Sequence, residues 1–404
     1  MQPFFSLRPV ELYTIAFLGS SAMYIVFAFW LKKAAISRPL LQTLLAAGIL
    51  LRIALVPLVP VGSDDIYRYI WDGKVQSAGI NPYRHAPDAP ELEDLHSAEL
   101  PSLVNHPSMK TVYFPLTQWA FWLGYQMAGE HPWGIKFLLL AAELGTLLLL
   151  VNLLRWNGIP EKHVLLYALC PLPILMFALD GHIDALGLPV LLLALLLWIR
   201  DRKVTSLLLL GISMSVKPVA LVILPLLFFR EKGLSGRLRV LFLPFVPMIL
   251  QFLPYFFTAN PLESIVTFSV HWTFNGAVFE AIYMVVANNQ LARLVCAVLL
   301  GAGVVVLAIR RKDVLNGTYA AILMLLLFSP VVHPWYVSWL AVLLPLVRRW
   351  SGILFVATVS LSTLTVLNYQ LTGDWSQHPW VLVLEYAPVL VAGLYELFIS
   401  PEPA

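Results

Sequence analysis

Charged side chains are scarce in this sequence. Only 12% of its 404 residues are charged and 59% are hydrophobic, whereas soluble proteins contain about 25% charged and roughly 45–50% apolar residues. So few charges cannot cover the surface of a water-soluble chain of this length. The composition therefore excludes a soluble fold and favours a protein that exposes most of its surface to lipid.

Cysteine and other special features are scarce as well. The two cysteines, Cys170 and Cys296, lie in apolar runs, which excludes a disulfide framework and predicts core residues. The formal net charge of +3 is too small to argue for nucleic acid. No long internal repeat, coiled-coil pattern or low-complexity tract interrupts the chain. We expect residues 1–404 to form a single membrane domain.

What the chain does have is long apolar blocks. A helix of roughly 20 residues crosses a bilayer core of about 30 Å, and several blocks approach that length. None alternates as a barrel strand would, and backbone in lipid must satisfy its own hydrogen bonds, so these spans are predicted to be helices. The clearest blocks are residues 138–154, 164–179, 186–199, 240–257 and 291–309.

The positive charges predict how these spans are oriented. Seventeen of the 26 basic residues fall in six short loops, which by the positive-inside rule face the cytoplasm. These residues are Lys32, Lys33 and Arg38; Arg155 and Lys162; Arg200, Arg202 and Lys203; Arg230, Lys232, Arg237 and Arg239; Arg310, Arg311 and Lys312; and Arg348 and Arg349.

Cytoplasmic loops must be separated by an even number of crossings. This parity predicts 13 spans, with 12 as the alternative, an outer N-terminus and an inner C-terminus. It also requires that residues 114–128 form a re-entrant or interfacial helix. Two large loops are then expected on the outer face, residues 62–113, with juxtamembrane helices, and residues 258–290.

The first two of four polar clusters on this outer face contain acidic residues. Asp64 and Asp65 directly follow a predicted span. When carboxyl groups are crowded and partly buried, the pKa of one of them rises toward the working pH, which suits a general base. Alternatively, these carboxyl groups only cap a helix.

The second cluster is the turn 180–184. Its His182 and Asp184 could orient a base, bind sugar hydroxyls or merely satisfy the hydrogen bonds of the turn backbone. Without further ligands, no metal site is predicted.

The other two clusters carry a lysine and a histidine. Lys217 lies at the outer end of a broken apolar hairpin, where it must snorkel to water or pair with an anion such as phosphate. His333 lies between prolines and can present its ring to a ligand. Trp335 and Tyr336 beside it would suit an aromatic belt at the bilayer interface or stack on a sugar. Four such clusters on one face favour a functional site.

The motifs, taken in order, are Asp-Asp-Ile-Tyr-Arg-Tyr (64–69), Asn-Pro-Tyr (81–83), Tyr-Phe-Pro-Leu-Thr (113–117), Asp-Gly-His-Ile-Asp-Ala-Leu (180–186), Lys-Pro (217–218) and His-Pro-Trp-Tyr (333–336). Together they resemble the membrane-embedded glycosyltransferases of the GT-C superfamily. The sequence looks most like the bacterial polyprenol-phosphate-mannose-dependent mannosyltransferases, and more distantly like the mannosyltransferase of the glycolipid-anchor pathway. The resemblance covers residues 60 to 345, most of the chain.

This resemblance implies an all-α polytopic enzyme that transfers a sugar, with inversion, from a polyprenyl monophosphate to an acceptor. We expect a hexosyltransferase, with mannose the favoured sugar, in the bacterial cytoplasmic membrane with its active site facing the periplasm or outside. Glucose, galactose, arabinose and an amino sugar stay open, as do lipid, glycan and protein acceptors. Neither a cofactor nor a metal is expected, because a monophosphate donor brings less charge than a nucleotide diphosphate.

The resemblance also implies roles for individual residues. The family's base is an acidic residue of the first outer loop, which maps onto Asp65 or Asp64, with Asp65 favoured because it directly precedes Ile-Tyr. Donors aimed at the departing phosphate are expected to be Lys217, His333 and Arg68. Contacts with the sugar or the lipid groove are expected from His182, Asp184, Tyr113, Tyr67 and Trp335.

Three other functions compete with this interpretation. A transporter or flippase of lipid-linked sugars would place ionisable groups near the bilayer midplane, where only Arg52, Glu143, Arg293 and Glu385 are candidates. A lipid-linked glycan polymerase or ligase would share the outer active face, but predicts a pyrophosphate-linked donor and more outer arginines. A structural or assembly protein would require that the four polar clusters be coincidental.

Overall fold

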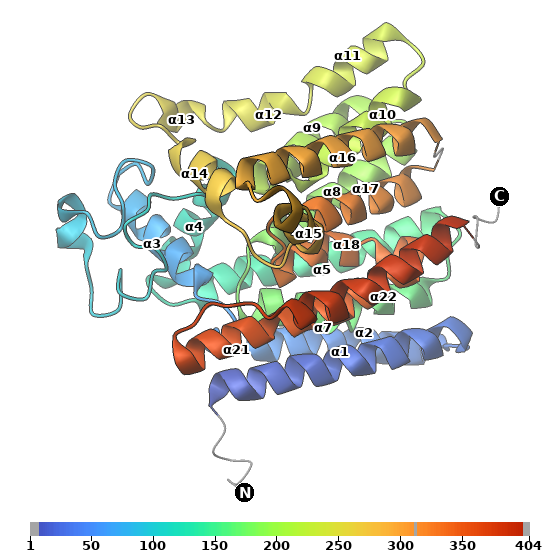
Figure 1. The fold of residues 1–404 in the computed structure, drawn as a ribbon, viewed down its shortest axis with the longest axis horizontal. Helices are drawn as coiled ribbons and strands as arrows, with labels where there is room; N and C mark the ends of the chain where they lie inside the picture. The colour runs from blue at the N-terminus through green and yellow to red at the C-terminus, as the bar shows by residue number, and fades with distance from the viewer. Residues whose placement is uncertain (1–7, 311–312, 399–404) are drawn as a thin grey trace, which may run out of the picture.

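The computed structural model describes residues 8–310 and 313–398, and its regular structure there is helical (Figure 1). The long helices are α1 (Pro9–Lys33), α2 (Arg38–Leu55), α5 (Trp133–Trp156), α8 (Asp184–Ile199), α9 (Lys203–Val216), α16 (Asn289–Arg310), α17 (Val314–Phe328) and α22 (Pro379–Phe398). Shorter helices are α3 (Asp65–Ser77), α4 (Pro115–Ala128), α6 (Leu165–Ala168), α7 (Pro171–Pro173), α10 (Leu224–Arg230), α11 (Leu234–Phe242), α12 (Phe245–Leu250), α13 (Leu253–Phe256), α14 (Glu263–His271), α15 (Ala277–Val286), α18 (Ser338–Ala341), α19 (Leu344–Val347), α20 (Trp350–Thr358) and α21 (Thr363–Thr372). Short 3₁₀ segments are η2 (Pro90–Leu95), η3 (Glu161–Val164), η5 (Pro218–Ile223), η6 (Pro334–Val337) and η7 (Val359–Ser362), and η4 (Ile174–Leu179) is a π-helix.

The predicted all-α membrane fold is confirmed. Among the described residues, six helices are long and apolar enough to cross a bilayer, and a bent pair of segments, Glu161–Ala168 and Pro171–Leu179, would make a seventh. The six are Pro9–Lys33, Arg38–Leu55, Trp133–Trp156, Asn289–Arg310, Trp350–Thr372 and Pro379–Leu397. The total of 13 spans stays a prediction, since the other apolar segments are shorter or broken.

At the break in the bent pair, a buried side chain donates hydrogen bonds to backbone carbonyls of the broken helix. Pro171 has no N–H for the Tyr167 carbonyl, and the helix bends by 46° at this break. The buried guanidinium of Arg52 donates to the carbonyls of Tyr167 and Ala168, at 3.4 and 2.6 Å, and pairs with Glu143 at 3.0 Å. Arg52 and Glu143, two of the candidate charges of a transport pathway, therefore join helices together.

The first outer loop gathers at one end of the long helices, beside α14 (Figure 1). Its helix α3 packs against α4, so closely that a Cβ on Gly73 would lie 2.4 Å from the Phe121 carbonyl oxygen. Residues 115–128, expected as a re-entrant or interfacial segment, thus form a helix that packs between α3 and α5. Its depth in the membrane stays a prediction.

Candidate active site

A cavity of about 1150 Å³ lies among the polar clusters that were predicted from the sequence. Nine of the ten side chains predicted from the sequence line it: Asp64, Asp65, Tyr67, Arg68, Tyr113, Asp184, Lys217, His333 and Trp335. The tenth, His182, lies directly behind Trp335, with 3.6 Å between the two ring centroids. The fold therefore brings all four polar clusters together around one space.

The acid pair stands where α3 begins. Asp64 precedes the helix and Asp65 is its first residue, yet the Asp64 side chain makes no capping hydrogen bond. Instead, the side-chain amide of Asn105 donates to both carboxylates, at 2.8 Å each. The carboxylates thus face the cavity rather than the helix end. Asn105 was missed from the sequence, because a lone asparagine in a long loop gives no signal of where it folds.

The environments of the two carboxyl groups differ. Burial raises the pKa of Asp64, and the neighbouring charge of Asp65 raises it further. Burial would also raise the pKa of Asp65, but the His182 ring and the Asn105 amide outweigh it and lower that pKa to about 2. The His182 Nδ1 lies 3.6 Å from an Asp65 carboxylate oxygen. Asp65 is therefore ionised at any physiological pH, while Asp64 is the more easily protonated member.

The approach to the acid pair is fixed by Asp180. Its carboxylate accepts hydrogen bonds from the backbone N–H groups of Val61 and Gly62, at 3.0 and 2.9 Å, and from the Tyr13 hydroxyl at 2.7 Å. Gly181 follows with a φ of 82°, and a Cβ there would lie 2.4 Å from the Ile66 side chain. The second polar cluster thus supports the chain segment that leads into the first.

Lys217 pairs with an anion rather than extending into water. Its ammonium lies 2.9 and 3.1 Å from the two carboxylate oxygens of Asp184, and 3.4 Å from the centroid of the Tyr336 ring. The Trp339 indole N–H also donates to Asp184, at 2.7 Å. Burial lowers the pKa of Lys217, against the opposing effect of Asp184 and Asp65. Of the two sequence interpretations for this lysine, ion pairing describes its position.

A stack of four rings forms one wall of the site. Trp335 lies between His182 and His333, with centroid distances of 3.6 and 4.4 Å and near-parallel planes. Phe274 covers the other face of His333, at 4.7 Å. Both faces of Trp335 are therefore occupied, which leaves only its edge for a sugar. Both ring nitrogens of His182 are buried and make no hydrogen bond among the described residues.

His333 contributes a neutral ring to this wall. Burial lowers its pKa to about 3, with the charge of Asp65 opposing and the charge of Lys217 adding to that effect. At neutral pH a ring nitrogen of His333 can therefore donate a hydrogen bond but brings no positive charge. The cationic contribution at this end of the cavity comes from Lys217.

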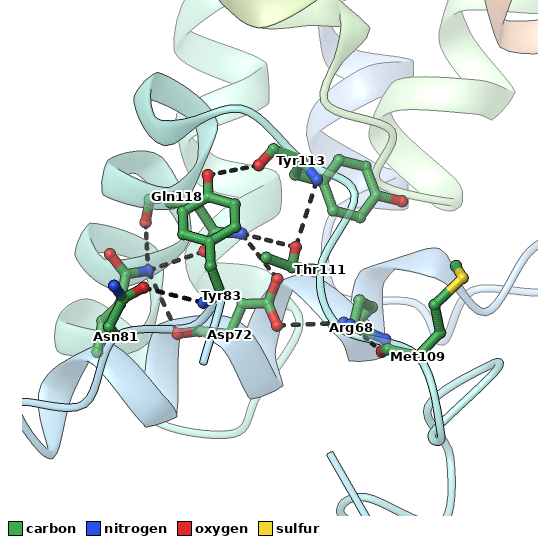
Figure 2. Close-up of polar contacts among 9 residues, drawn as sticks. Arg68, Asp72, Asn81, Tyr83, Met109, Thr111, Tyr113 and Gln118 are labelled. Carbon is green, nitrogen blue, oxygen red and sulfur yellow. Dashed lines mark hydrogen bonds and ion pairs between the residues drawn. The ribbon is translucent and has the colours of Figure 1, made fainter. Parts of the chain in front are cut away.

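Arg68 belongs to a polar network that shapes the loop above α3 (Figure 2). Its guanidinium pairs with Asp72 at 3.1 Å and donates to the Met109 carbonyl at 2.6 Å. Gln118 donates to Asp72 and to the Thr111 hydroxyl, both at 2.8 Å (Figure 2). The segment that carries Asn105 and Tyr113 is thereby tied to α3 and α4. Arg68 also lines the cavity, and two of its five N–H donors serve this network.

The second outer loop closes over the first. Lys110 pairs with Glu263 of α14 at 2.9 Å, and the rings of His106 and Trp272 meet edge to face at 5.1 Å. Residues from both segments, 62–113 and 258–290, thus line the cavity. Within residues 8–310 and 313–398, no three His, Cys, Asp or Glu side chains are grouped so that they could hold a metal ion.

Two models of known protein families match this chain. Residues 3–230 match the family model for the N-terminal domain of alpha-(1->6)-mannopyranosyltransferases, and residues 272–398 match the MptB C-terminal domain. No curated protein matches the chain. The first match alone covers more than half of the sequence, so the resemblance to GT-C mannosyltransferases is confirmed. The chain therefore belongs to the MptA_B family of mannosyltransferases, membrane glycosyltransferases of the GT-C type.

Proposed function

We propose that this mannosyltransferase takes mannose from a polyprenyl-phosphate donor and passes it to an acceptor hydroxyl on the outer face of the bacterial cytoplasmic membrane. The observation that carries the proposal is the enclosed cavity in which an ionised carboxylate, Asp65, and a cation, Lys217, line the same space. Residues 1–404 act as one membrane domain in this proposal, with the two large loops covering its outer end.

Asp65 is proposed as the general base. The acceptor oxygen attacks the anomeric carbon and gives its proton to the Asp65 carboxylate, while the bond from that carbon to the phosphate oxygen breaks on the opposite face. The anomeric centre is inverted, so a β-linked donor would yield the α linkage named in the family's description. Asn105 holds the Asp65 carboxylate in place and the His182 ring lies beside it. Asp64 is the alternative base, because its pKa is the one that is raised in the structure.

The leaving polyprenyl phosphate needs compensation for the charge it gains. An ammonium has three N–H donors, so Lys217 can keep Asp184 as a partner and still donate to phosphate oxygens. His333 can add a neutral donor from the ring wall. Preorganised donors aimed at charge that develops in the transition state supply a large part of catalysis. Arg68, Tyr67 and Tyr113 are proposed to shape the sugar pocket.

The test is a transfer assay with the full chain in nanodiscs. Short-chain polyprenyl phosphates carrying mannose, glucose, galactose, arabinose or an amino sugar are supplied with a membrane-lipid extract as acceptor. We expect wild type to consume the mannosyl donor, and Asp65→Asn to lose at least about a hundredfold in rate. Asp64→Asn, which removes the same charge one residue earlier, is expected to lose much less.

Each result decides a part of the proposal. A greater loss in Asp64→Asn than in Asp65→Asn would move the base to Asp64. Consumption of a pyrophosphate-linked donor instead would favour the polymerase or ligase class. If wild type neither consumed nor bound any polyprenyl-phosphate sugar, the proposed donor would be wrong.

A further inference from the structure

The cavity extends beyond the residues that the proposed reaction uses. Part of its lining comes from the end of η7, from α21 and from the turn that follows α21, namely Ser362, Thr363, Val366, Tyr369, Gln370 and Trp375. None of these six side chains is basic. This extension therefore suits a neutral, hydroxyl-rich ligand better than a phosphate.

Two aromatic side chains of this extension present their rings. Trp375 and Tyr369 are each 49% exposed, and their rings meet edge to face with 5.3 Å between centroids. Apolar C–H faces of a sugar pack on such rings, while the polar edges of the rings and nearby amides meet its hydroxyls. The ring of Trp335 at the reaction centre is stacked with the rings of His182 and His333 and lacks this free face.

The exposed rings are joined to the reaction centre. Phe274 lies 5.5 Å from Trp375 on one side and 4.7 Å from His333 on the other, measured between ring centroids. A sugar packed on Trp375 would therefore be separated from His333 by the Phe274 ring. The exposed rings are therefore set back from the hydroxyl that reacts, at a position that a further sugar of the same acceptor would occupy.

The turn that carries Trp375 is held in place. Helix α21 ends at Thr372 and is followed by Gly373, whose φ is 77°, and Asn368 donates to the Asp374 carbonyl at 2.9 Å. Gln377 exchanges two hydrogen bonds with Asn275: its side-chain carbonyl accepts from the Asn275 backbone N–H at 3.1 Å, and its amide donates to the Asn275 side chain at 2.6 Å. Such a fixed ring loses little conformational freedom when a ligand binds.

We propose that Trp375 and Tyr369 form a subsite for a neutral sugar of a glycan acceptor, one that lies further along the acceptor than the hydroxyl receiving mannose. The inference rests on the proposed transfer reaction, because that reaction defines which hydroxyl is attacked. It predicts that the enzyme prefers acceptors of several sugars to a single sugar.

A second tryptophan provides the matched control. Trp380 is also 49% exposed and lies five residues further along the chain, at the start of α22, but it does not line the cavity. A tryptophan that only anchors the protein at the bilayer interface would respond like Trp380. The variants are Trp375→Ala, Trp375→Phe and Trp380→Ala in the full chain.

The first measurement is the binding of a fluorescently labelled mannotriose to the nanodisc-embedded protein without any donor. We expect Trp375→Ala to bind about five- to tenfold more weakly than wild type, because it loses one sugar–ring contact. Trp375→Phe and Trp380→Ala should stay within about twofold of wild type. The second measurement is transfer to mannoside acceptors of one and three sugars, where Trp375→Ala should raise the acceptor KM for the longer acceptor only.

The two measurements separate the subsite from the reaction. If wild type bound mannotriose through Trp375 but transferred no mannose, the proposed function would fail and the subsite would stand. The subsite is refuted if wild type does not bind the trisaccharide, if Trp375→Ala binds it normally, or if Trp380→Ala weakens binding to the same extent. A change in donor KM without a change in acceptor KM would also refute it.

Discussion

At the scale of single residues, Lys217 is predicted to act late in the reaction. We expect Lys217→Ala to lower kcat at least about a hundredfold, because it removes a donor that meets charge on the departing phosphate. The donor KM should change much less, since the bound donor carries less of that charge. Steady-state kinetics in nanodiscs measure both constants.

Lys110 is the matched control for this lysine. It also lines the cavity, but its ammonium pairs with Glu263 of α14 rather than with a residue beside the acid pair. Lys110→Ala should therefore leave kcat within a few-fold of wild type. If Lys217→Ala and Lys110→Ala gave the same small effect, Lys217 would have no special part in phosphate departure.

His333 is predicted to make the protein sensitive to acid. Burial lowers its pKa to about 3 in the folded protein, whereas an unfolded histidine titrates near 6.5. Between these values the unfolded chain binds more protons, so stability is present above about pH 6.5 and is lost as pH falls toward 3. The thermal midpoint of wild type should therefore fall on acidification from pH 7 to 4.

The variant His333→Phe keeps a ring in the stack and removes the titration. Its thermal midpoint should fall less than that of wild type over the same pH range, as followed by tryptophan fluorescence on heating. Asp65, with a pKa of about 2, contributes a loss only below about pH 4. Parallel curves for wild type and His333→Phe between pH 6.5 and 4 would contradict the assignment.

At the scale of elements, α22 holds the loop that carries Phe274. Its buried Glu385 accepts a hydrogen bond from the Asn275 side chain at 2.8 Å, and Tyr386 donates to the Asn275 carbonyl at 2.6 Å. Asn275 itself has a φ of 57°, in the left-handed region. Glu385→Ala should cost about 1–3 kcal/mol of stability, because the buried amide loses an acceptor, and should speed hydrogen exchange in residues 272–276.

Glu396 on the same helix is the control for this prediction. It accepts hydrogen bonds from the Ser351 backbone and hydroxyl, at 3.1 and 2.6 Å. Glu396→Ala should lower stability without changing exchange in residues 272–276. Transfer activity should fall with Glu385→Ala more than with Glu396→Ala. Equal exchange in the two variants would show that Glu385 does not hold this loop.

At the scale of the whole molecule, the predicted orientation can be tested by labelling. Single cysteines at Asp94, in the predicted first outer loop, and at Ser235, in the basic helix α11, would be introduced with Cys170 and Cys296 replaced. A membrane-impermeant maleimide should label Asp94→Cys in intact cells, and Ser235→Cys only after permeabilisation, because loops rich in lysine and arginine stay in the cytoplasm. The reverse pattern would invert the topology.

The sequence predicted the helical membrane fold and the residues that meet at the cavity, because both follow from where charges stand relative to apolar blocks. It could not predict their partners. Nothing local indicates that Asn105 bridges Asp64 and Asp65, or that Arg68 is tied to Asp72 and Met109. These contacts depend on how a long loop folds back over α3, which hydropathy does not report.

The side chain of Trp335 shows the same limit. Its position beside His333 indicated a site, but the sequence could not show that His182 and His333 would cover both its faces. Ring stacking between segments that are far apart in the chain is decided by tertiary packing. We therefore propose that Trp335 supports the two histidines, while contact of its edge with the sugar stays a prediction.

The ring stack couples the effects of substitutions at positions that are far apart in the sequence. Phe274, His333, Trp335 and His182 belong to three separate chain segments, yet each ring is held by the next, and the last stands beside Asp65. Changes at neighbouring rings should not add, because the first gap already frees the second ring. The order in which such changes arise would then matter: a substitution tolerated in one background would be harmful in another.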